Sequence, residues 1–272
     1  NGTYAGSIGG TGSLNIASGI VALTGTSSIS GATTVASGML FAHGALTTSS
    51  LTVANGATLS GKGSVNAAVT VADGGHLQLL RSNTLTTGAL TLDNGANLDA
   101  VLGSAVTGEA GMIKVNGNLV LDGRLNVTDA GAFGMGVYRL IDYTGTLTDN
   151  GLELGVIPAN LLASELSVQA SIDKQVNLVV GGGADLRFWN GSGNWNSTSS
   201  NWATSSGGAN QLWNDSFAVF QGAAGVVTVD GAQRFGGLQF MTDGYQLVAG
   251  TAGELVAVKS PSGDNVIRVD SG

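Results

Sequence analysis

The chain has 272 residues, of which 45 are glycine, 2 are proline and none is cysteine, and its formal net charge is −8. A glycine about every six residues excludes helix as the dominant element, because each glycine inside a helix costs about 1 kcal/mol relative to alanine. Charged residues make up only 10 % of the chain, and the ten lysine and arginine residues are dispersed, so nucleic acid is not an expected partner.

Other classes of protein are excluded by what the sequence lacks. No stretch approaches the ~20 apolar residues that a membrane span requires. The absence of cysteine removes disulfides, thiolate metal sites and cysteine nucleophiles together, and it suits a protein that crosses a periplasm. His43 and His76 are the only histidines. We therefore expect no metal, no cofactor and no catalytic residues, and we expect that the chain is not an enzyme.

A short unit recurs through the first half of the chain: three residues alternating apolar, polar and apolar, then two turn-forming residues, a glycine and another apolar residue. Its copies lie at residues 14–19, 35–40, 51–59, 69–77, 90–98 and, more loosely, 119–125. Its glycine stands at positions 19, 38, 56, 74 and 95, so the separation between copies varies little. Alternation indicates a strand with one buried face, and Asn-Gly or Asp-Gly supplies the positive φ of a tight corner.

One such unit cannot bury its apolar face alone, so the copies must stack. The repeat length predicts an all-β fold, a right-handed parallel β-helix with about 18–20 residues per coil and coils about 4.8 Å apart. The alternative is a β-sandwich or an up-and-down barrel. Those folds usually show a turn signal roughly every ten residues, so the longer spacing observed here favours the β-helix.

The pattern changes near residue 130. Residues 134–145 predict a strand with aromatic side chains, and residues 158–162 predict the start of one helical turn. Alternation over residues 166–172 and 176–180, with a turn at Asp173-Lys174, predicts a hairpin or two successive strands. The three glycines at 181–183 predict a boundary, so residues 1–183 and 184–272 are expected to form two regions, the second a further, truncated unit.

All four tryptophans, Trp189, Trp195, Trp202 and Trp213, lie in the second region, and strands are predicted at residues 217–220, 226–231, 238–240, 245–250 and 266–269. Exposed aromatic rings stack on sugars, so these rings are candidates for a glycan platform. The competing interpretation makes them packing anchors whose N–H groups find carbonyl partners, and it is favoured because large aromatic rings dominate burial energetics. The polar loop around them is the candidate interaction surface.

Four segments together resemble the passenger region of bacterial type V autotransporters, in particular the passenger-associated β-strand repeats. They are residues 51–63, residues 136–143, the tryptophan-containing stretch 189–202 and residues 244–250. The resemblance implies a right-handed β-helix displayed on a Gram-negative cell surface, reached through the periplasm and active in adhesion or aggregation. It also implies as partners a host surface protein or glycan, the same protein on another cell, and the outer-membrane β-barrel of the same parent chain.

Three functions remain open from the sequence. The first is a non-catalytic surface scaffold for adhesion or cell–cell aggregation. The second is a carbohydrate-binding or carbohydrate-active β-helix, a lyase or hydrolase, against which the scarcity of charge counts. The third is an assembly element whose stable coils help to drive folding during export. The aspartates beside glycine, at positions 73, 93, 122 and 230, are interpreted as turn formers, and Asp270-Ser271-Gly272 is interpreted as a turn.

Overall fold

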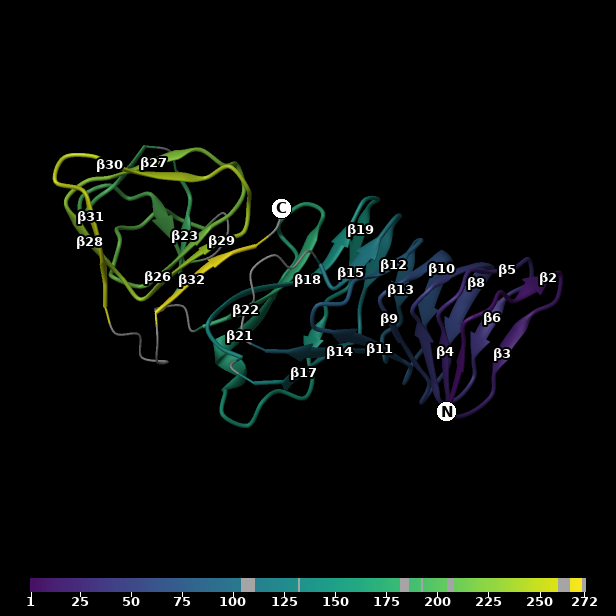
Figure 1. Cartoon of the computed structure of the whole chain (residues 1–272). Helices are drawn as coiled ribbons and strands as arrows, with labels where there is room; N and C mark the ends of the chain where they lie inside the picture. Colours follow the sequence, from purple (N-terminus) through teal and green to yellow (C-terminus); the bar gives the residue numbers. More distant parts are fainter. Residues whose placement is uncertain are drawn as a thin grey trace.

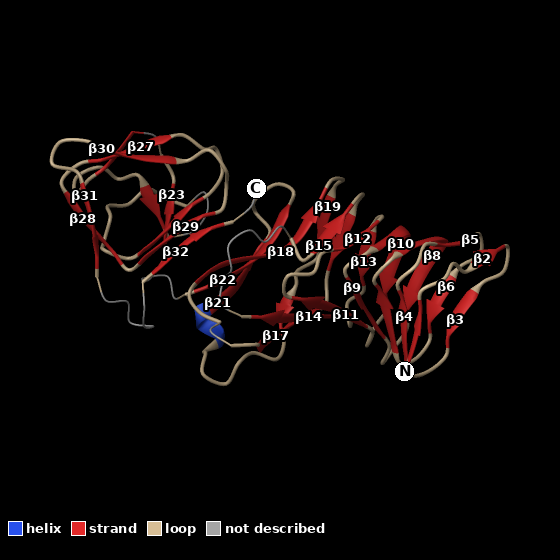
Figure 2. Ribbon diagram, viewed as in Figure 1, coloured by secondary structure: helices blue, strands red, loops and turns tan. Residues whose placement is uncertain are grey.

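The computed structural model describes residues 1–103, 111–131, 133–181, 186–191, 193–204, 208–258 and 265–270. Over these ranges the protein is all-β, with strands in parallel sheets and a single turn of 3-10 helix, η1 (Ala163–Glu165). Figure 2 shows this turn as the only helical segment among the described residues. The predicted all-β class and parallel pairing are confirmed, and the helical turn lies just beyond the predicted 158–162.

Within the described ranges, one sheet contains eight parallel strands that follow one another in chain order (Figure 1). The strands are β1 (Gly2–Tyr4), β4 (Ile20–Leu23), β7 (Met39–Ala42), β9 (Thr58–Gly61), β11 (His76–Leu80), β14 (Asn97–Leu102), β17 (Arg124–Asp129) and β20 (Glu153–Leu154). Gly2 pairs with Val21 and Ile20 with Met39, so each strand meets its counterpart in the next repeat. Towards the end of this sheet the paired positions lie further apart in the sequence: Asn97 pairs with Arg124, and Arg124 pairs with Glu153.

The inner face of this sheet carries a row of leucines. Leu40, Leu59, Leu77, Leu98 and Leu125 occupy paired positions on successive strands, and each is fully buried. Because neighbouring strands lie about 4.8 Å apart, each leucine packs on the leucine before and after it. Burying such a side chain stabilises the fold by about 1.5–3 kcal/mol, so the row explains why every repeat needs an apolar residue at this position.

Fourteen of the described strands form a second sheet. Twelve of them are β2 (Gly9–Gly10), β3 (Leu14–Ile16), β5 (Ser27–Ile29), β6 (Thr33–Val35), β8 (Ala45–Val53), β10 (Ser64–Val71), β12 (Leu85–Thr87), β13 (Leu90–Leu92), β15 (Ile113–Val115), β16 (Leu119–Leu121), β18 (Gly136–Tyr143) and β19 (Leu147–Asp149). The two long strands β8 and β10 pair along most of their length, and β10 continues in parallel to both β12 and β13. The repeat therefore contributes strands to two sheets in turn.

The parallel stacking ends at a pair of antiparallel strands. β18 pairs in parallel with β15 on one side and antiparallel with β22 (Gln175–Val180) on the other. β22 also pairs antiparallel with β21 (Leu166–Gln169), which forms the predicted hairpin. Figure 1 shows these strands beyond β15 and β19, at the end of the stack far from the N-terminus.

A second group of strands begins at Leu186 (Figure 1). Its described strands are β23 (Leu186–Trp189), β24 (Gly193–Trp195), β25 (Trp202–Ala203), β26 (Phe217–Phe220), β27 (Val226–Val229), β28 (Ala232–Phe235), β29 (Gly237–Phe240), β30 (Gln246–Ala249), β31 (Glu254–Ala257) and β32 (Val266–Val269). They form short sheets in which β23, β26, β29 and β32 pair in parallel, as do β24, β27 and β30, and β28 and β31. All strand pairs described in this group are parallel except that of β25 with β23.

Among the described residues, the buried apolar side chains form three clusters. The first runs from Ile16 to Val180 and contains the leucine row. The second contains the rings of Trp189, Trp195 and Trp202. The third joins residues of both strand groups, because Val137 and Val179 pack with Leu186, Phe188 and Phe217, among others. In the part of the chain that the structure describes, no helix has the length and apolar character needed to cross a bilayer.

Candidate functional site

Outward-facing side chains of the eight-stranded sheet form regular polar rows. Since side chains alternate along a strand, the neighbours of the buried leucines point away from the core. Parallel, in-register pairing then places His76 beside Asn97 and Asn97 beside Arg124. The next outward row places Asp99 beside Asn126. His76 points to the opposite face from the buried Leu77, and 35 % of its side chain is exposed.

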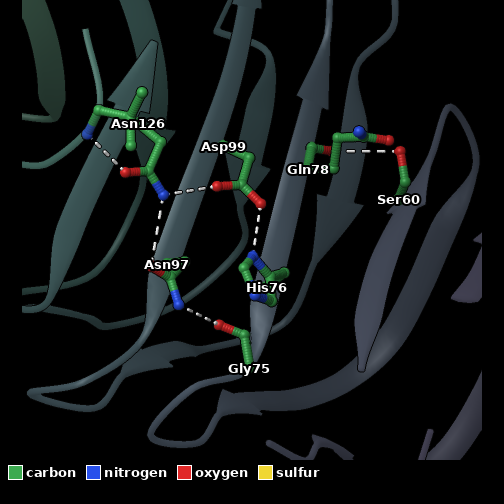
Figure 3. Close-up of polar contacts among 8 residues, drawn as sticks. Ser60, Gly75, His76, Gln78, Asn97, Asp99 and Asn126 are labelled. Carbon is green, nitrogen blue, oxygen red and sulfur yellow. Dashed lines mark hydrogen bonds and ion pairs between the residues drawn. The ribbon is translucent and has the colours of Figure 1, made fainter. Parts of the chain in front are cut away.

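Four of these residues, His76, Asn97, Asp99 and Asn126, bond to one another and are called the polar ladder here (Figure 3). His76 Nδ1 lies 2.7 Å from Asp99 Oδ2, and Asn126 Nδ2 donates to Asp99 Oδ1 at 2.8 Å and to Asn97 Oδ1 at 3.3 Å. An ionised carboxylate only accepts, so Nδ1 of His76 carries the proton. Three successive strands are thereby tied together on their outer face.

Backbone groups bond to two members of the polar ladder, Asn97 and Asn126. Asn97 Nδ2 donates to the carbonyl of Gly75 at 3.4 Å, and the backbone N–H of Val156 donates to Asn126 Oδ1 at 2.8 Å. The side chains of His76 and Asp99 remain about one third exposed, at 35 % and 27 %. The polar ladder is thus an ordered, partly accessible set of hydrogen-bonding groups. Among the described residues, no three or more histidine, aspartate or glutamate side chains are grouped so that they could bind a metal ion.

The larger sheet carries a row of threonines on its outer face. Thr34 pairs with Thr52, Thr52 with Thr70, and Thr70 with Thr91. Each lies between two buried residues and is itself partly exposed. Neighbouring hydroxyl groups therefore repeat at about the 4.8 Å spacing of the strands, which gives this face a regular pattern of hydrogen-bond donors and acceptors.

The four tryptophans of the candidate interaction loop lie together. Trp189, Trp195 and Trp202 are buried, at 6 %, 0 % and 0 % exposure, and Trp213 is partly buried against them. Ring centroids of Trp202 are 5.1 Å from Trp189, 5.0 Å from Trp195 and 4.4 Å from Trp213. Phe220 on β26 packs against the same rings. The faces of three of the four rings are occupied by protein.

Two of the indole N–H groups, those of Trp195 and Trp202, lack among the described residues the carbonyl partner that was predicted. Trp213 Nε1 donates to the carbonyl of Arg234 at 2.8 Å, as predicted for a packed tryptophan. Nε1 of Trp195 and of Trp202 is buried without an acceptor among the residues that the structure describes. Edge-to-face contacts with neighbouring rings surround both, at interplanar angles of 68° and 77° for Trp195, and a ring face is a weak acceptor for N–H. The role of the polar residues around the rings stays a prediction.

The aspartates interpreted as turn formers do more than form turns. Asp122 Oδ1 accepts from the neighbouring N–H of Gly123 at 2.8 Å, which is a local bond, and also from Asn94 Nδ2 at 3.4 Å. Asp73 Oδ1 accepts from the N–H of Gly95 at 2.7 Å, and Asp230 Oδ1 accepts from that of Thr251 at 2.9 Å. These bonds span 22 and 21 residues and link successive repeats. The repeat spacing in the sequence was the signal that could have found them.

Two further groups were missed from the sequence. The polar ladder joins residues 23 to 29 apart, so it is visible only once the strand register is known. The other is a buried network around Gln239, whose amide bonds to Val137 and to Asp270. Asp270, interpreted as part of a turn, also pairs with Arg268 at 2.6 Å and is 3 % exposed. The rest of that turn, Ser271 and Gly272, lies outside the described residues.

Comparison with known proteins gives a relative over nearly the whole chain. "Adhesin BmaC autotransporter" of Brucella suis biovar 1 (strain 1330) is 39 % identical over 308 residues, which cover 99 % of this chain. The chain spans 9 % of the length of that relative. No protein-family model matches the chain. The Tapirin C-terminal domain of Caldicellulosiruptor kristjanssonii aligns over 99 % of this chain and 88 % of its own, at 11 % identity and a TM-score of 0.25, a likeness too small to carry an argument.

Proposed function

We propose, from the premise that this chain is an autotransporter passenger-type sequence, that it is a non-catalytic, surface-displayed segment that supports adhesion or cell–cell aggregation. In this proposal the stacked parallel strands follow the path of a right-handed β-helix. Residues 1–183 form its repeat region with closing strands, and residues 184–272 begin a further passenger unit. The location proposed is the surface of a Gram-negative cell, reached through the periplasm.

The observation that carries the proposal is the 39 % identity over 99 % of the chain to a protein named as an adhesin autotransporter. Strand pairing at a nearly constant offset in the first repeats supports the β-helical path, since each repeat returns to the same sheet one step along the stack. Separate buried clusters before and after residue 183 support the two regions, although a third cluster joins them.

Regular outer faces suit adhesion through many weak contacts. The polar ladder and the threonine row, Thr34 to Thr91, each repeat hydrogen-bonding groups at the strand spacing. A single such contact contributes little, but contacts that act together raise the overall affinity by orders of magnitude without any new chemistry. The partners proposed are a host surface protein or glycan, or the same protein on another cell, with the outer-membrane β-barrel of the parent chain as the anchor.

A non-enzymatic role is favoured over a carbohydrate-active one. Most glycoside hydrolases use two carboxyl groups held about 5 to 9.5 Å apart on either side of the scissile bond. In the described part of the chain, the carboxylates of Asp73, Asp122 and Asp230 are each engaged by backbone N–H groups, and Asp99 is engaged by His76 and Asn126. These groups serve the fold, and the adhesin name of the relative points the same way.

The proposal is tested by displaying residues 1–272 on a non-adherent, non-aggregating bacterium through an unrelated outer-membrane anchor. We expect faster settling of the culture or greater attachment to host epithelial cells than with the anchor alone. The matched control carries a triple substitution on the outer rows, Thr52→Ala, Thr70→Ala and Thr91→Ala, which leaves the buried rows intact. Settling and attachment equal to those of the empty anchor would overturn the proposal. Depolymerised polysaccharide after incubation with the purified chain would instead support the carbohydrate-active alternative.

A further inference from the structure

The outer face of the eight-stranded sheet changes in character along the stack. Its outward side chains on β4 and β7 are apolar and at least partly exposed: Ile20, Ala22, Met39 and Phe41. On β11, β14 and β17 the same face carries the polar ladder. The two parts are continuous, because Met39 pairs with Thr58 on β9 and Thr58 pairs with His76. Apolar and hydrogen-bonding groups therefore share one accessible sheet face.

Phe41 provides an aromatic platform in the apolar part of this face. It stands between the buried Leu40 and Ala42, so its ring points outward, and it is partly exposed. The ring stacks on that of His43, with 5.2 Å between centroids and an interplanar angle of 19°. The face of an aromatic ring carries negative charge density, so it attracts the partly positive C–H groups on one side of a sugar ring. Phe41 can therefore hold one sugar ring.

The polar ladder keeps hydrogen-bonding capacity for a ligand. Asp99 Oδ1 and Oδ2 each accept one bond within the ladder, and a carboxylate oxygen has room for two. With its proton on Nδ1, neutral His76 offers Nε2 as an acceptor, and this atom has no partner among the described residues. The side chains of His76 and Asp99 are 35 % and 27 % exposed, so a ligand can reach them. Their mutual bonds already fix both side chains, which lowers the entropy cost of binding.

The spacing of these groups fits an extended chain of sugars. Phe41 and Asp99 lie in one outward row on β7, β9, β11 and β14, about 14 Å apart along the stack at about 4.8 Å per strand. Between them, the buried Ser60 donates to the carbonyl of Gln78 at 3.2 Å and so offers no group of its own (Figure 3). A β-1,4-linked chain of pyranose rings is extended and advances by close to one strand spacing per sugar, whereas an α-1,4-linked chain curves away from such a line.

We infer that this face binds a neutral, extended β-1,4-linked oligosaccharide that lies along the stack, with one sugar on Phe41 and the hydroxyl groups of later sugars on His76 and Asp99. A neutral chain is favoured over an acidic one, because the Asp99 carboxylate lies on its path and the formal net charge of the protein is −8. An extended peptide is disfavoured, since it adds to a free strand edge, whereas the strands of this face are already paired on both sides.

The inference rests on the proposed adhesive function, which it deepens by naming a ligand class and the face that binds it. The threonine row lies on the other sheet, so the two contributions can be removed separately. Absence of oligosaccharide binding would overturn this inference alone, whereas the display experiment described above decides the proposed function.

The test compares cellohexaose with maltohexaose on the purified 272-residue chain. Both are neutral chains of glucose of the same length, and they differ only in the linkage, which is β-1,4 in the first and α-1,4 in the second. We expect a dissociation constant on the order of 0.1 mM for cellohexaose, and at least about tenfold weaker binding of maltohexaose and of cellobiose, which is too short to reach from Phe41 to Asp99. Isothermal titration calorimetry measures all three. Equal affinities, or no binding, would overturn the inference, and so would tighter binding of an acidic glycan such as hyaluronan.

The substitution Phe41→Leu tests the face itself. We expect it to weaken cellohexaose binding at least about fivefold, because the aromatic ring is lost. The thermal midpoint should stay close to that of the parent chain, because leucine keeps the apolar contacts of a partly exposed position. Thr70→Ala, on the outer face of the other sheet, is the matched control and should leave binding unchanged. Cellohexaose binding retained in Phe41→Leu, or lost in Thr70→Ala, would overturn the inference. Should Phe41→Leu fail to fold, the comparison of the three sugars on the unchanged chain decides.

Discussion

Close approach between successive repeats depends on individual glycines. An added Cβ at Gly44 would overlap the carbonyl oxygen of Gly25 and lie 2.7 Å from that of Thr24. An added Cβ at Gly63 would likewise overlap the carbonyl oxygen of Gly44, which lies one repeat earlier in the chain. The backbone of Gly44 does not adopt a positive φ, so the requirement for glycine comes from space alone. This is a different requirement from the positive φ that the sequence predicted at corner glycines such as Gly38, which has a φ of 77°.

We therefore expect Gly44→Ala to lower the free energy of unfolding by about 1–3 kcal/mol, the usual cost of overpacking. The control is Gly12→Ala, because an added Cβ there meets nothing within 4 Å and its φ is not positive. That substitution should be neutral or slightly stabilising through the unfolded chain. Chemical denaturation followed by far-ultraviolet circular dichroism measures both. Equal stability of the two variants would contradict the steric explanation.

Tyr138 gives the fold a dependence on alkaline pH. Burial raises the pKa of its hydroxyl above the ordinary value of 10.0, and the hydroxyl donates to the carbonyl of Gly134 at 2.8 Å. A pKa that is higher in the folded state means that the folded state holds the proton more tightly. Its contribution to stability is therefore fully present below about pH 10 and is lost as pH rises through the folded pKa.

We expect the free energy of unfolding to fall as the pH rises above about 10, and Tyr138→Phe to make this fall smaller. At about pH 8 the variant should be about 1 kcal/mol less stable, since it loses the hydrogen bond to Gly134. Tyr245, whose pKa burial also raises, contributes to the fall that remains. Denaturation curves at each pH measure the effect. An identical pH dependence in the variant and the parent chain would refute this assignment to Tyr138.

At the level of elements, the local signals were readable from the sequence and the distant ones were not. Residues 217–220 were predicted as a strand, and β26 has these bounds, because alternation and aromatic content are local properties. The hairpin at 166–180 was found for the same reason. The longer offsets between β14, β17 and β20 were not predicted, since the repeat becomes loose after residue 98 and insertion lengths leave no periodic signal. The right-handed β-helical path of the chain and its division into residues 1–183 and 184–272 stay predictions.

The free edge of one strand is satisfied by a side chain from far along the sequence. β15 pairs with β18 only over Ile141 to Tyr143, so the preceding part of β18 lacks a strand neighbour on that side among the described residues. The amide of Gln239 takes that place: its Nε2 donates to the carbonyl of Val137 at 2.7 Å and its Oε1 accepts from the N–H of Val137 at 2.8 Å. No sequence pattern joins residues 102 apart, which is why this contact was missed.

We expect Gln239→Leu to lower the free energy of unfolding by at least about 2 kcal/mol, because two buried backbone groups and the Asp270 carboxylate lose a partner. Gln246→Leu, at an exposed position on β30, is the control and should cost little. Thermal and chemical unfolding of the two variants provide the measurement. A stability loss of similar size in both would show that Gln239 has no special role.

For the whole molecule, Gln239 couples two cores. It sits on β29 of the second strand group and bonds to β18 of the first, and Arg139 Nη2 adds a bond to the carbonyl of Met241 at 3.3 Å. All four tryptophans lie in the second group, so fluorescence reports that group while circular dichroism reports both. In the parent chain the two signals should change together. In Gln239→Leu the fluorescence transition should separate from the circular dichroism transition, and coincident transitions would argue against coupling through this residue.

Parallel pairing between successive repeats has a mechanical consequence. The backbone hydrogen bonds of each sheet point from one repeat to the next, along the direction in which the strands succeed one another. A pull on the two ends in that direction loads these layers in series, so the outermost layer detaches while those behind it stay intact. Each detached layer, one repeat of the chain, releases roughly 60 Å of extended backbone. Tethered between surfaces in flowing liquid, such a chain would lengthen in increments and absorb tension before it broke.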